Sequence, residues 1–442
     1  MQKQKFGIVL PIILLSYFMI LLDNSIVFTS TVKIAADLNL TTATLAWVTN
    51  AYTLTFGGLL LLGGRAGDIF GRKRVFLLGL VIFSIGSLFV GLSTNATTII
   101  AMRAFQGIGS AILAPTTLAL LMDNYEGPMR IKAIAYYGAT GGLGASFGLV
   151  IGGLIASYLS WRDGFLLNVP IGILMFLLTL KFVKGGQAQA GQLDWWGAIT
   201  SVVGLSALIY GISGGNISVP ALIVAVVALG LFVLQERRSV APIMPLRLFK
   251  DNERTSAYVA RFFFLGAMIS YFFLAPQAMQ HVYGYSPLMA AIGFLPETIP
   301  QFVGATVLSR LNNRFTNTQL LVFGVMTTLV GVALGAVMGV QRGYWLAIGI
   351  PMIIIGIGQG FTLSPLTVAG VAHTDPEIAG SASGVVNTAH QIGSSFGLSV
   401  VVSLTSQYTA YATSFNHALI WMTVLMVIAL VATLNILRGS HS

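Results

Sequence analysis

The sequence predicts an all-α membrane protein with 14 transmembrane helices, built as two six-helix bundles related by a pseudo-twofold repeat plus two inserted helices. Three observations predict this fold class: the composition, a series of long apolar segments and an internal repeat. Of the 442 residues, 56% are hydrophobic and only 8% are charged, whereas soluble domains carry about 25% charged residues. A soluble protein of this composition would lack the polar surface needed to cover its core, so lipid is the solvent that suits the chain.

The apolar segments recur from one end of the chain to the other, and a helix needs about 20 such residues to cross the hydrocarbon core. Their recurrence excludes a soluble domain with a single anchor. The first segment is also too long for the apolar part of a cleaved signal peptide. The predicted spans are 7–29, 43–63, 75–93, 97–121, 133–157, 164–183, 195–213, 217–235, 256–278, 287–308, 318–339, 344–370, 378–404 and 414–436.

The basic residues predict how these spans are oriented. If both termini are cytoplasmic, 18 of the 23 Lys and Arg residues lie on the cytoplasmic side, and only Lys33, Arg162 and Arg342 lie outside. Cytoplasmic loops of membrane proteins carry such an excess. We therefore expect a multi-pass protein of the plasma or inner membrane. The same distribution explains the net charge of +10 without a nucleic-acid partner.

The two halves of the chain resemble each other in sequence. The stretch GASFGL at 144–149 returns as GSSFGL at 393–398, and the glycines and proline of 107–115 return at 358–365. Such repeats are typical of secondary transporters, whose substrate site lies between the halves near the membrane midplane. Alternatively, small-residue stripes recur in any packed membrane bundle. The repeat predicts an N-terminal bundle, a linker with two extra helices and a C-terminal bundle at 1–183, 184–255 and 256–442.

The segment between the second and third predicted spans reads GRAGDIFGRKR. Its glycines allow a tight turn, and its aspartate, at a helix end, can accept from backbone amides or pair with the basic residues that follow. Such a segment can hold two helices together in one state and release them in another, although a basic run alone can also be a simple cytoplasmic anchor. We expect it to gate the cytoplasmic side through Gly64, Asp68, Gly71, Arg72 and Lys73.

Two charged residues of opposite sign fall inside predicted spans. Asp23 and Arg103 each lie six residues from the outer end of their span, which at 1.5 Å per residue places both about 9 Å deep. An arginine in hydrocarbon is costly unless it faces a partner or water. We therefore expect the two to pair. The alternative is a pair with a purely structural role.

Glu297 lies ten residues into the tenth predicted span, between Pro296 and Pro300, at a depth of about 15 Å. The prolines predict a kink that exposes backbone groups to a cavity. A carboxylate there can bind a proton or a lipophilic cation but not both, which is a physical basis for antiport. The alternative is a permanently protonated acid that only bonds another helix.

Two further polar residues fall in predicted spans. His390 lies near the midplane, where a single histidine is more often a satisfied hydrogen-bonding group than a proton carrier. Arg261 lies near the inner end of its span, so we expect its side chain to snorkel to the cytoplasmic interface.

Several of these motifs resemble those of the major facilitator superfamily. The segment 64–74 resembles its signature loop, Gly-x-x-x-Asp-x-x-Gly-Arg-Lys. Arg103 with Gln106 resembles its span-4 motif, in which the arginine is tied to proton movement. Span 5 resembles the antiporter motif Gly-x-x-x-Gly-Pro-x-x-Gly-Gly, with Leu149 in place of the proline. Its glycines also fit simple helix packing and are Gly144, Gly148, Gly152 and Gly153.

The stretch LDNSIV at 22–27 and the span from Gly380 to Gly397 are similar to elements of the fourteen-helix drug:proton antiporters. Membership of this branch implies a monomeric, proton-coupled exporter of lipophilic drugs or antibiotics that works by alternating access. The two acids inside the spans favour a cationic cargo, but a neutral antibiotic or an amphiphile also fits. Asp23 and Glu297 would titrate, and Arg103 would tune Asp23. The substrate cavity would hold Gln106, Asn387, His390 and Gln391.

Two other functions stay open. Leu149 in place of the motif's proline also fits a symporter or facilitator of a natural metabolite, and a transport-dead membrane sensor is a third possibility. The sequence has no metal-ligand spacing, no Gly-x-x-x-x-Gly-Lys-Ser/Thr loop, no catalytic triad and no cysteine. We therefore expect no enzyme activity, no cofactor and no metal. The expected partners are a small-molecule substrate, protons and the lipid bilayer, and the energy source is a gradient.

Overall fold

The computed structural model describes residues 6–185, 191–213, 217–240, 242–375 and 379–439. Over these residues the chain forms helices and no strand. The N-terminal helices are α1 (Val9–Leu38), α2 (Thr42–Phe70), α3 (Arg72–Gly91), α4 (Ala96–Asn124), α5 (Gly127–Tyr158), α6 (Trp161–Leu166) and α7 (Asn168–Phe182). They are followed by α8 (Trp195–Ile212) and α9 (Val219–Arg238).

A short 3₁₀ helix, Leu246–Lys250, leads into the C-terminal helices. These are α10 (Asn252–Tyr283), α11 (Pro287–Ile292), α12 (Leu295–Leu311), α13 (Asn317–Met338), α14 (Ile350–Gly360), α15 (Leu363–Gly370), α16 (Ala379–Thr405) and α17 (Tyr411–Gly439). A π-helix, Trp345–Gly349, precedes α14.

Within the described ranges, 12 stretches are long and apolar enough to cross a membrane. The pairs α6–α7 and α11–α12 each form one such stretch, and so does Trp345–Gly370. The two remaining predicted spans, 133–157 and 378–404, coincide with α5 and α16, which are not among the 12. The all-helical membrane fold is therefore confirmed, whereas the count of 14 crossings stays a prediction.

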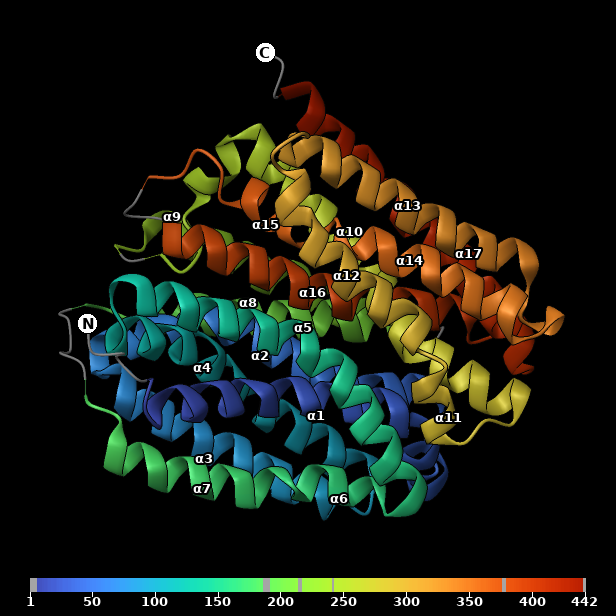
Figure 1. Ribbon diagram of the computed structural model, residues 1–442, viewed down its shortest axis with the longest axis horizontal. Coiled ribbons are helices and arrows are strands. Elements are labelled where there is room, and N and C mark those ends of the chain that lie inside the picture. The colour runs from blue at the N-terminus through green and yellow to red at the C-terminus, as the bar shows by residue number, and fades with distance from the viewer. Residues whose placement is uncertain (1–5, 186–190, 214–216, 241, 376–378, 440–442) are drawn as a thin grey trace.

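The two halves of the chain form two layers of helices (Figure 1), with the N-terminal helices below and the C-terminal helices above in that view. The inserted helices α8 and α9 pack on each other, and α8 also contacts α2 and α16. The repeated glycines pack equivalent helices. A Cβ on Gly148 of α5 would lie 2.7 Å from Ser25 on α1, and a Cβ on Gly397 of α16 would lie 2.2 Å from the Cα of Gly266 on α10.

Helix starts are fixed by local capping. Thr41 accepts from the amide of Thr44 ahead of α2, and Asn95 accepts from the amide of Thr98 ahead of α4. Such side chains satisfy amides that lack an intrahelical partner. The same polar residues that interrupt the apolar pattern therefore also begin the spans.

The connection between α2 and α3 is much tighter than the sequence predicted. Helix α2 continues to Phe70, so Gly64 and Asp68 lie in its last turns and not in a loop. The turn is the single residue Gly71, whose φ of 91° lies in the left-handed region that favours glycine. Gly64 is a packing residue, since a Cβ there would contact the ring of Pro115 on α4 at 3.5 Å.

The tenth predicted span is broken and not merely kinked. Helix α11 ends at Ile292 and α12 begins at Leu295, which places Glu297 in the first turn of α12. Pro296 stands in that same first turn, where its missing N–H costs nothing. The predicted kink at Pro296 is therefore wrong, because this proline starts a helix, while Pro300 lies inside it.

Candidate functional site

A cavity of about 1390 Å³ lies between the two halves of the chain. This volume exceeds that of most drug-sized pockets. Residues of α1, α2, α4, α10 and α16 line it, together with linker residues 192–194 and 242–247. At one end it reaches Arg65, Asp68 and Arg72 at the α2–α3 turn.

The opposite end is closed where α5 meets α11. A Cβ on Gly153 would lie 2.7 Å from the Cβ of Ala291, and the amide of Leu288 donates to Ser157 Oγ at 2.9 Å. Three of the four predicted packing glycines face α1 within their own half, namely Gly144, Gly148 and Gly152. Gly153 faces α11 in the other half. The lining residues Arg65 and Arg247 are exposed, so the cavity opens at the end with the basic α2–α3 turn and is closed at the other.

Helices α2 and α16 join the two halves beside the cavity. Asn50 Nδ2 donates to Ser399 Oγ at 2.7 Å, and Thr53 and Ser395 share a hydrogen bond. Next to them, Gly57 approaches the side chain of Gln391 so closely that a Cβ would lie 2.5 Å away. Movement of one half against the other must preserve or break these contacts.

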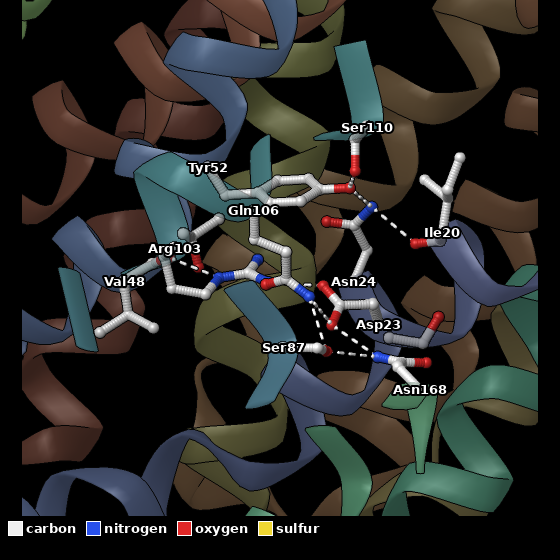
Figure 2. A network of polar contacts seen from close by, with 12 residues as sticks. Ile20, Asp23, Asn24, Val48, Tyr52, Ser87, Arg103, Gln106, Ser110 and Asn168 are labelled. Atoms are coloured by element: carbon white, nitrogen blue, oxygen red, sulfur yellow. Dashed lines mark hydrogen bonds and ion pairs between the residues drawn. The ribbon is translucent and has the colours of Figure 1, made fainter. Parts of the chain in front are cut away.

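The structure brings Asp23 and Arg103 together (Figure 2). Arg103 Nη1 donates to Asp23 Oδ2 at 2.5 Å and to Gln106 Oε1 at 2.7 Å. Gln106 Nε2 donates to Asp23 Oδ1 at 2.7 Å. The guanidinium lies 4.1 Å over the ring of Tyr52, and its Nε donates to the carbonyl of Val48. The predicted contact is present although α1 continues to Leu38, beyond the predicted end of its span.

Two further residues complete this network. Asn168 Nδ2 donates to Asp23 Oδ1 at 3.1 Å and to Ser87 Oγ at 2.9 Å. Ser87 also accepts from Gln106. Neither Asn168 nor Ser87 was among the predicted site residues, and nothing in the sequence indicated that α3 and α7 would approach Asp23.

The Asp23–Arg103 pair does not reach the cavity. Both residues are 0% exposed, and the cavity wall at this point is formed by the neighbouring Asn24. Gln106, predicted to line the cavity, is also fully buried and belongs to the Asp23 network, so that prediction is wrong. A carboxylate with several N–H donors and a guanidinium has what it needs to stay charged in a dry interior.

Glu297, like Asp23, is an acid with 0% exposure that lies inside a predicted span. Gln359 Nε2 donates to its Oε1 at 2.6 Å, whereas Oε2 has no hydrogen-bond partner among the described residues. Gln359 Oε1 in turn accepts from Gln301 at 3.3 Å. Both glutamines line the cavity and Glu297 does not, so one amide side chain separates this acid from the cavity.

The α2–α3 turn is held by a three-residue cluster. Arg72 bonds Asp68 at 2.9 Å and Asp123 at 2.5 Å, while Lys73 donates to the carbonyl of Leu180. These bonds join α2, α3, α4 and α7, all in the N-terminal half. The sequence did not single out Asp123, which lies in the last turn of the long apolar helix α4 with no motif around it.

Of the remaining predicted cavity residues, Asn387, His390 and Gln391 line the cavity. Arg261 does not snorkel. Its side chain is only 6% exposed, and it donates to Thr367 and lies 3.3 Å from His390 Nδ1. The position of Arg261 along its predicted span did not indicate which way the side chain points. In the structure it points into the protein.

The sequence profile of the Major Facilitator Superfamily matches residues 13–398. The chain belongs to the major facilitator superfamily. Members of this superfamily are membrane transporters and not enzymes, so this chain is a multi-pass transporter.

Curated relatives in this superfamily include export and resistance proteins. The chain is 33% identical to the cephamycin export protein CmcT of Amycolatopsis lactamdurans, over 95% of this chain and 90% of that protein. It is 32% identical to the puromycin resistance protein pur8 of Streptomyces alboniger, over 91% and 82%. A crystal structure of the peptide transporter POT in complex with sulfate matches with a TM-score of 0.73 and 17% identity, covering 99% of this chain and 96% of that one, which supports the fold alone.

Proposed function

We propose that this major facilitator exports lipophilic small molecules from the cell in exchange for protons. Its relatives named for antibiotic export and resistance support the direction and the class of cargo. The cavity supports it by its volume and by aromatic wall residues such as Phe56, Tyr137 and Phe272. In this proposal the chain crosses the cell membrane 14 times with both termini in the cytoplasm, and residues 1–183 rock against 256–442 around the inserted 184–255.

The observation that carries the proton coupling is the half-satisfied carboxyl of Glu297. Its Oε2 is buried and lacks a partner among the described residues, which suits a group that carries a proton in this state. Loss of that proton would leave a buried charge, whose cost is high unless donors turn toward it. The nearest donor is Gln359, which lines the cavity, so a change of charge on Glu297 would rearrange the cavity wall.

Asp23 takes a different role in this proposal. Its oxygens already accept from Arg103, Gln106 and Asn168, so it holds its negative charge here and gains a proton only if Arg103 moves away. A shift of α1 relative to α4 within the N-terminal half would be such a movement. Asp23 and Arg103 are therefore the second coupling pair, inside the N-terminal half.

Opening and closing are assigned to two opposite ends. At the open end, Arg72 holds α2, α3 and α4 together through Asp68 and Asp123. Gly71 forms the turn, Gly64 packs against α4, and Lys73 anchors α3 to α7. At the closed end, Gly153 seats α11 against α5. Alternating access then exchanges which end is sealed.

The charge of the cargo is not set by the two membrane acids. The sequence favoured cations because Asp23 and Glu297 are the acids of the predicted spans, but in this conformation neither lines the cavity. Direct competition of a cationic cargo with a proton for one carboxylate therefore has no geometric support in this state. The coupling proposed here acts through Gln359.

A growth-inhibition panel in an efflux-deficient host, with and without the protein, identifies a substrate. Uptake of that substrate into inside-out vesicles under an imposed pH gradient then tests the function. We expect uptake that collapses with the gradient and with Glu297→Gln, and not with the exposed control Glu126→Gln. Uptake that persists in Glu297→Gln combined with Asp23→Asn rejects proton coupling by these acids. Proton movement in the same direction as the substrate indicates a symporter.

A further inference from the structure

Arg261 is a buried cation without an acidic partner. Arg103 is also buried, but it pairs with Asp23, whereas no ion pair involves Arg261 among the described residues. Its Nη1 donates to the carbonyl of Leu363 at 3.2 Å and to Thr367 Oγ1 at 2.9 Å, and its Nε has no partner there. These acceptors are neutral, so the charge is left without compensation in a setting where that is costly.

The contact with His390 fixes what the histidine offers to the cavity. Arg261 Nη2 lies 3.3 Å from His390 Nδ1. An arginine only donates, so Nδ1 must accept and the ring proton must sit on Nε2. His390 lines the cavity and Arg261 lies directly behind it. A neutral N–H donor, backed by a positive charge, therefore belongs to the cavity wall.

The rest of the cavity wall agrees with a site for negative charge. Its acidic lining residues are Asp68 and Asp194, both at the end with the α2–α3 turn, and Asp68 is already bound by Arg72. Arg65 and Arg247 also line that end. No acid lies on the described wall around His390, so the field there is positive and would attract an anion entering from the open end.

We propose that His390 and Arg261 form an anion-binding subsite of the cavity, which takes the carboxylate or similar monoanionic group of an amphiphilic substrate. His390 contacts the anion and Arg261 supplies the counter-charge from behind it. The lipophilic part of the same molecule lies against the apolar wall formed by Leu265, Met268 and Phe272 of α10. The subsite would make amphiphilic anions a substrate class of the proposed exporter. Anion binding itself does not depend on the proposed function, but its biological role does.

Binding is tested on the full chain in phosphatidylcholine nanodiscs, without a pH gradient. The probes share one ring and differ in charge: 2-naphthoate, 2-naphthalenemethanol and 2-naphthylmethylammonium, each titrated by calorimetry against empty nanodiscs. We expect wild type to prefer 2-naphthoate. Arg261→Gln should weaken 2-naphthoate binding about 10-fold or more, as removal of one member of a buried charge contact does, and leave the alcohol unchanged. Arg261→Lys should retain much of the preference, and the exposed control Arg310→Gln all of it.

Two results overturn the proposal. One is unchanged 2-naphthoate binding in Arg261→Gln, which makes Arg261 a brace between α10 and α15 only. If Arg261→Gln also loses the alcohol, the cavity itself is damaged and His390→Leu decides: unchanged 2-naphthoate binding in that variant is the second overturning result. Nanodiscs that contain phosphatidylglycerol distinguish a substrate anion from a lipid headgroup. If phosphatidylglycerol competes with 2-naphthoate for wild type, the subsite binds a lipid headgroup. This binding assay uses no pH gradient, whereas proton coupling is measured by uptake into vesicles, so failure of proton coupling and failure of this subsite are distinguishable.

Discussion

Gln359 links Glu297 to the central cavity, because its amide donates to the Glu297 carboxyl at 2.6 Å and its side chain lines the cavity wall. In the proposed function, proton binding at Glu297 and substrate binding in the cavity would therefore share the Gln359 side chain without sharing one site. The two helices that carry these residues are tightly apposed, because a Cβ on Gly356 of α14 would lie 2.1 Å from the carbonyl of Glu297. Because α12 and α14 pack this closely, a change of charge on Glu297 would be passed on to Gln359.

Gln359→Leu should uncouple transport from the proton gradient. The variant removes the described hydrogen-bond donor of a buried carboxyl, which costs about 1–3 kcal/mol, and it removes the link to the cavity. Substrate uptake in vesicles is measured with and without a pH gradient. In a double-mutant cycle with Glu297→Gln, the two losses should not add, because the residues act as a unit. Fully additive losses would contradict a shared role.

Arg103→Met should destabilise the protein strongly, by about 3–5 kcal/mol, because Asp23 would remain as a buried charge without its counter-ion. The double variant Arg103→Met with Asp23→Asn should recover part of that loss. Thermal unfolding in detergent measures both. A double variant that is less stable than Arg103→Met alone would contradict the account of Asp23 as a charge held in place by Arg103.

Gly153→Ala should shift the protein away from the conformation described above. The added methyl group meets Ala291 and the carbonyl of Pro287 at 2.7 and 3.0 Å, so α5 and α11 must separate. Since the chain has no cysteine, Asn387→Cys provides a single reporter on the cavity wall. Its labelling by an impermeant maleimide from the α2–α3 side should slow in Gly153→Ala. The matched control in α5 is Gly138→Ala, where a Cβ meets nothing within 4 Å, and equal labelling in both variants would remove the proposed role of this contact.

Asp123→Asn should impair transport about as much as Asp68→Asn, since Arg72 bonds both carboxylates. The cluster is partly exposed, so each change should cost less than about 1 kcal/mol of stability. Transport rates and thermal unfolding are measured side by side. A large drop in stability with normal transport would make the cluster structural and not part of the opening movement.

Pairing of Asp23 with Arg103 was predictable because two opposite charges inside apolar spans have few other ways to be satisfied. The other members of that network were not predictable: Ser87 and Asn168 lie on α3 and α7, and only the packing of four helices brings them to Asp23. Arg261 was wrongly expected at the interface for a similar reason. Its position along the span was known, but the face of α10 that would be buried was not.

The same limit applies to the ends of elements. The motif of the α2–α3 segment was recognised in the sequence, but its loop was not, because helix α2 includes Gly64 and Asp68. Arg72 pairs with Asp68 in the last turn of that helix and with Asp123 of α4. The break between α11 and α12 at Gly293 and Phe294 could not be predicted from the sequence, where only Gly293, Pro296 and Pro300 pointed to an irregular helix. The position of such a helix break depends on how neighbouring helices pack, which the sequence does not show.

The most direct test of proton carriage by Glu297 is proton release on substrate binding. The purified protein in weakly buffered detergent is mixed with the compound identified by growth inhibition, and a pH indicator records the change. We predict release from wild type and from Glu126→Gln, and none from Glu297→Gln, although Glu297→Gln should still bind the compound. Equal release from Glu297→Gln and wild type would contradict the account and would assign the coupled proton to another group.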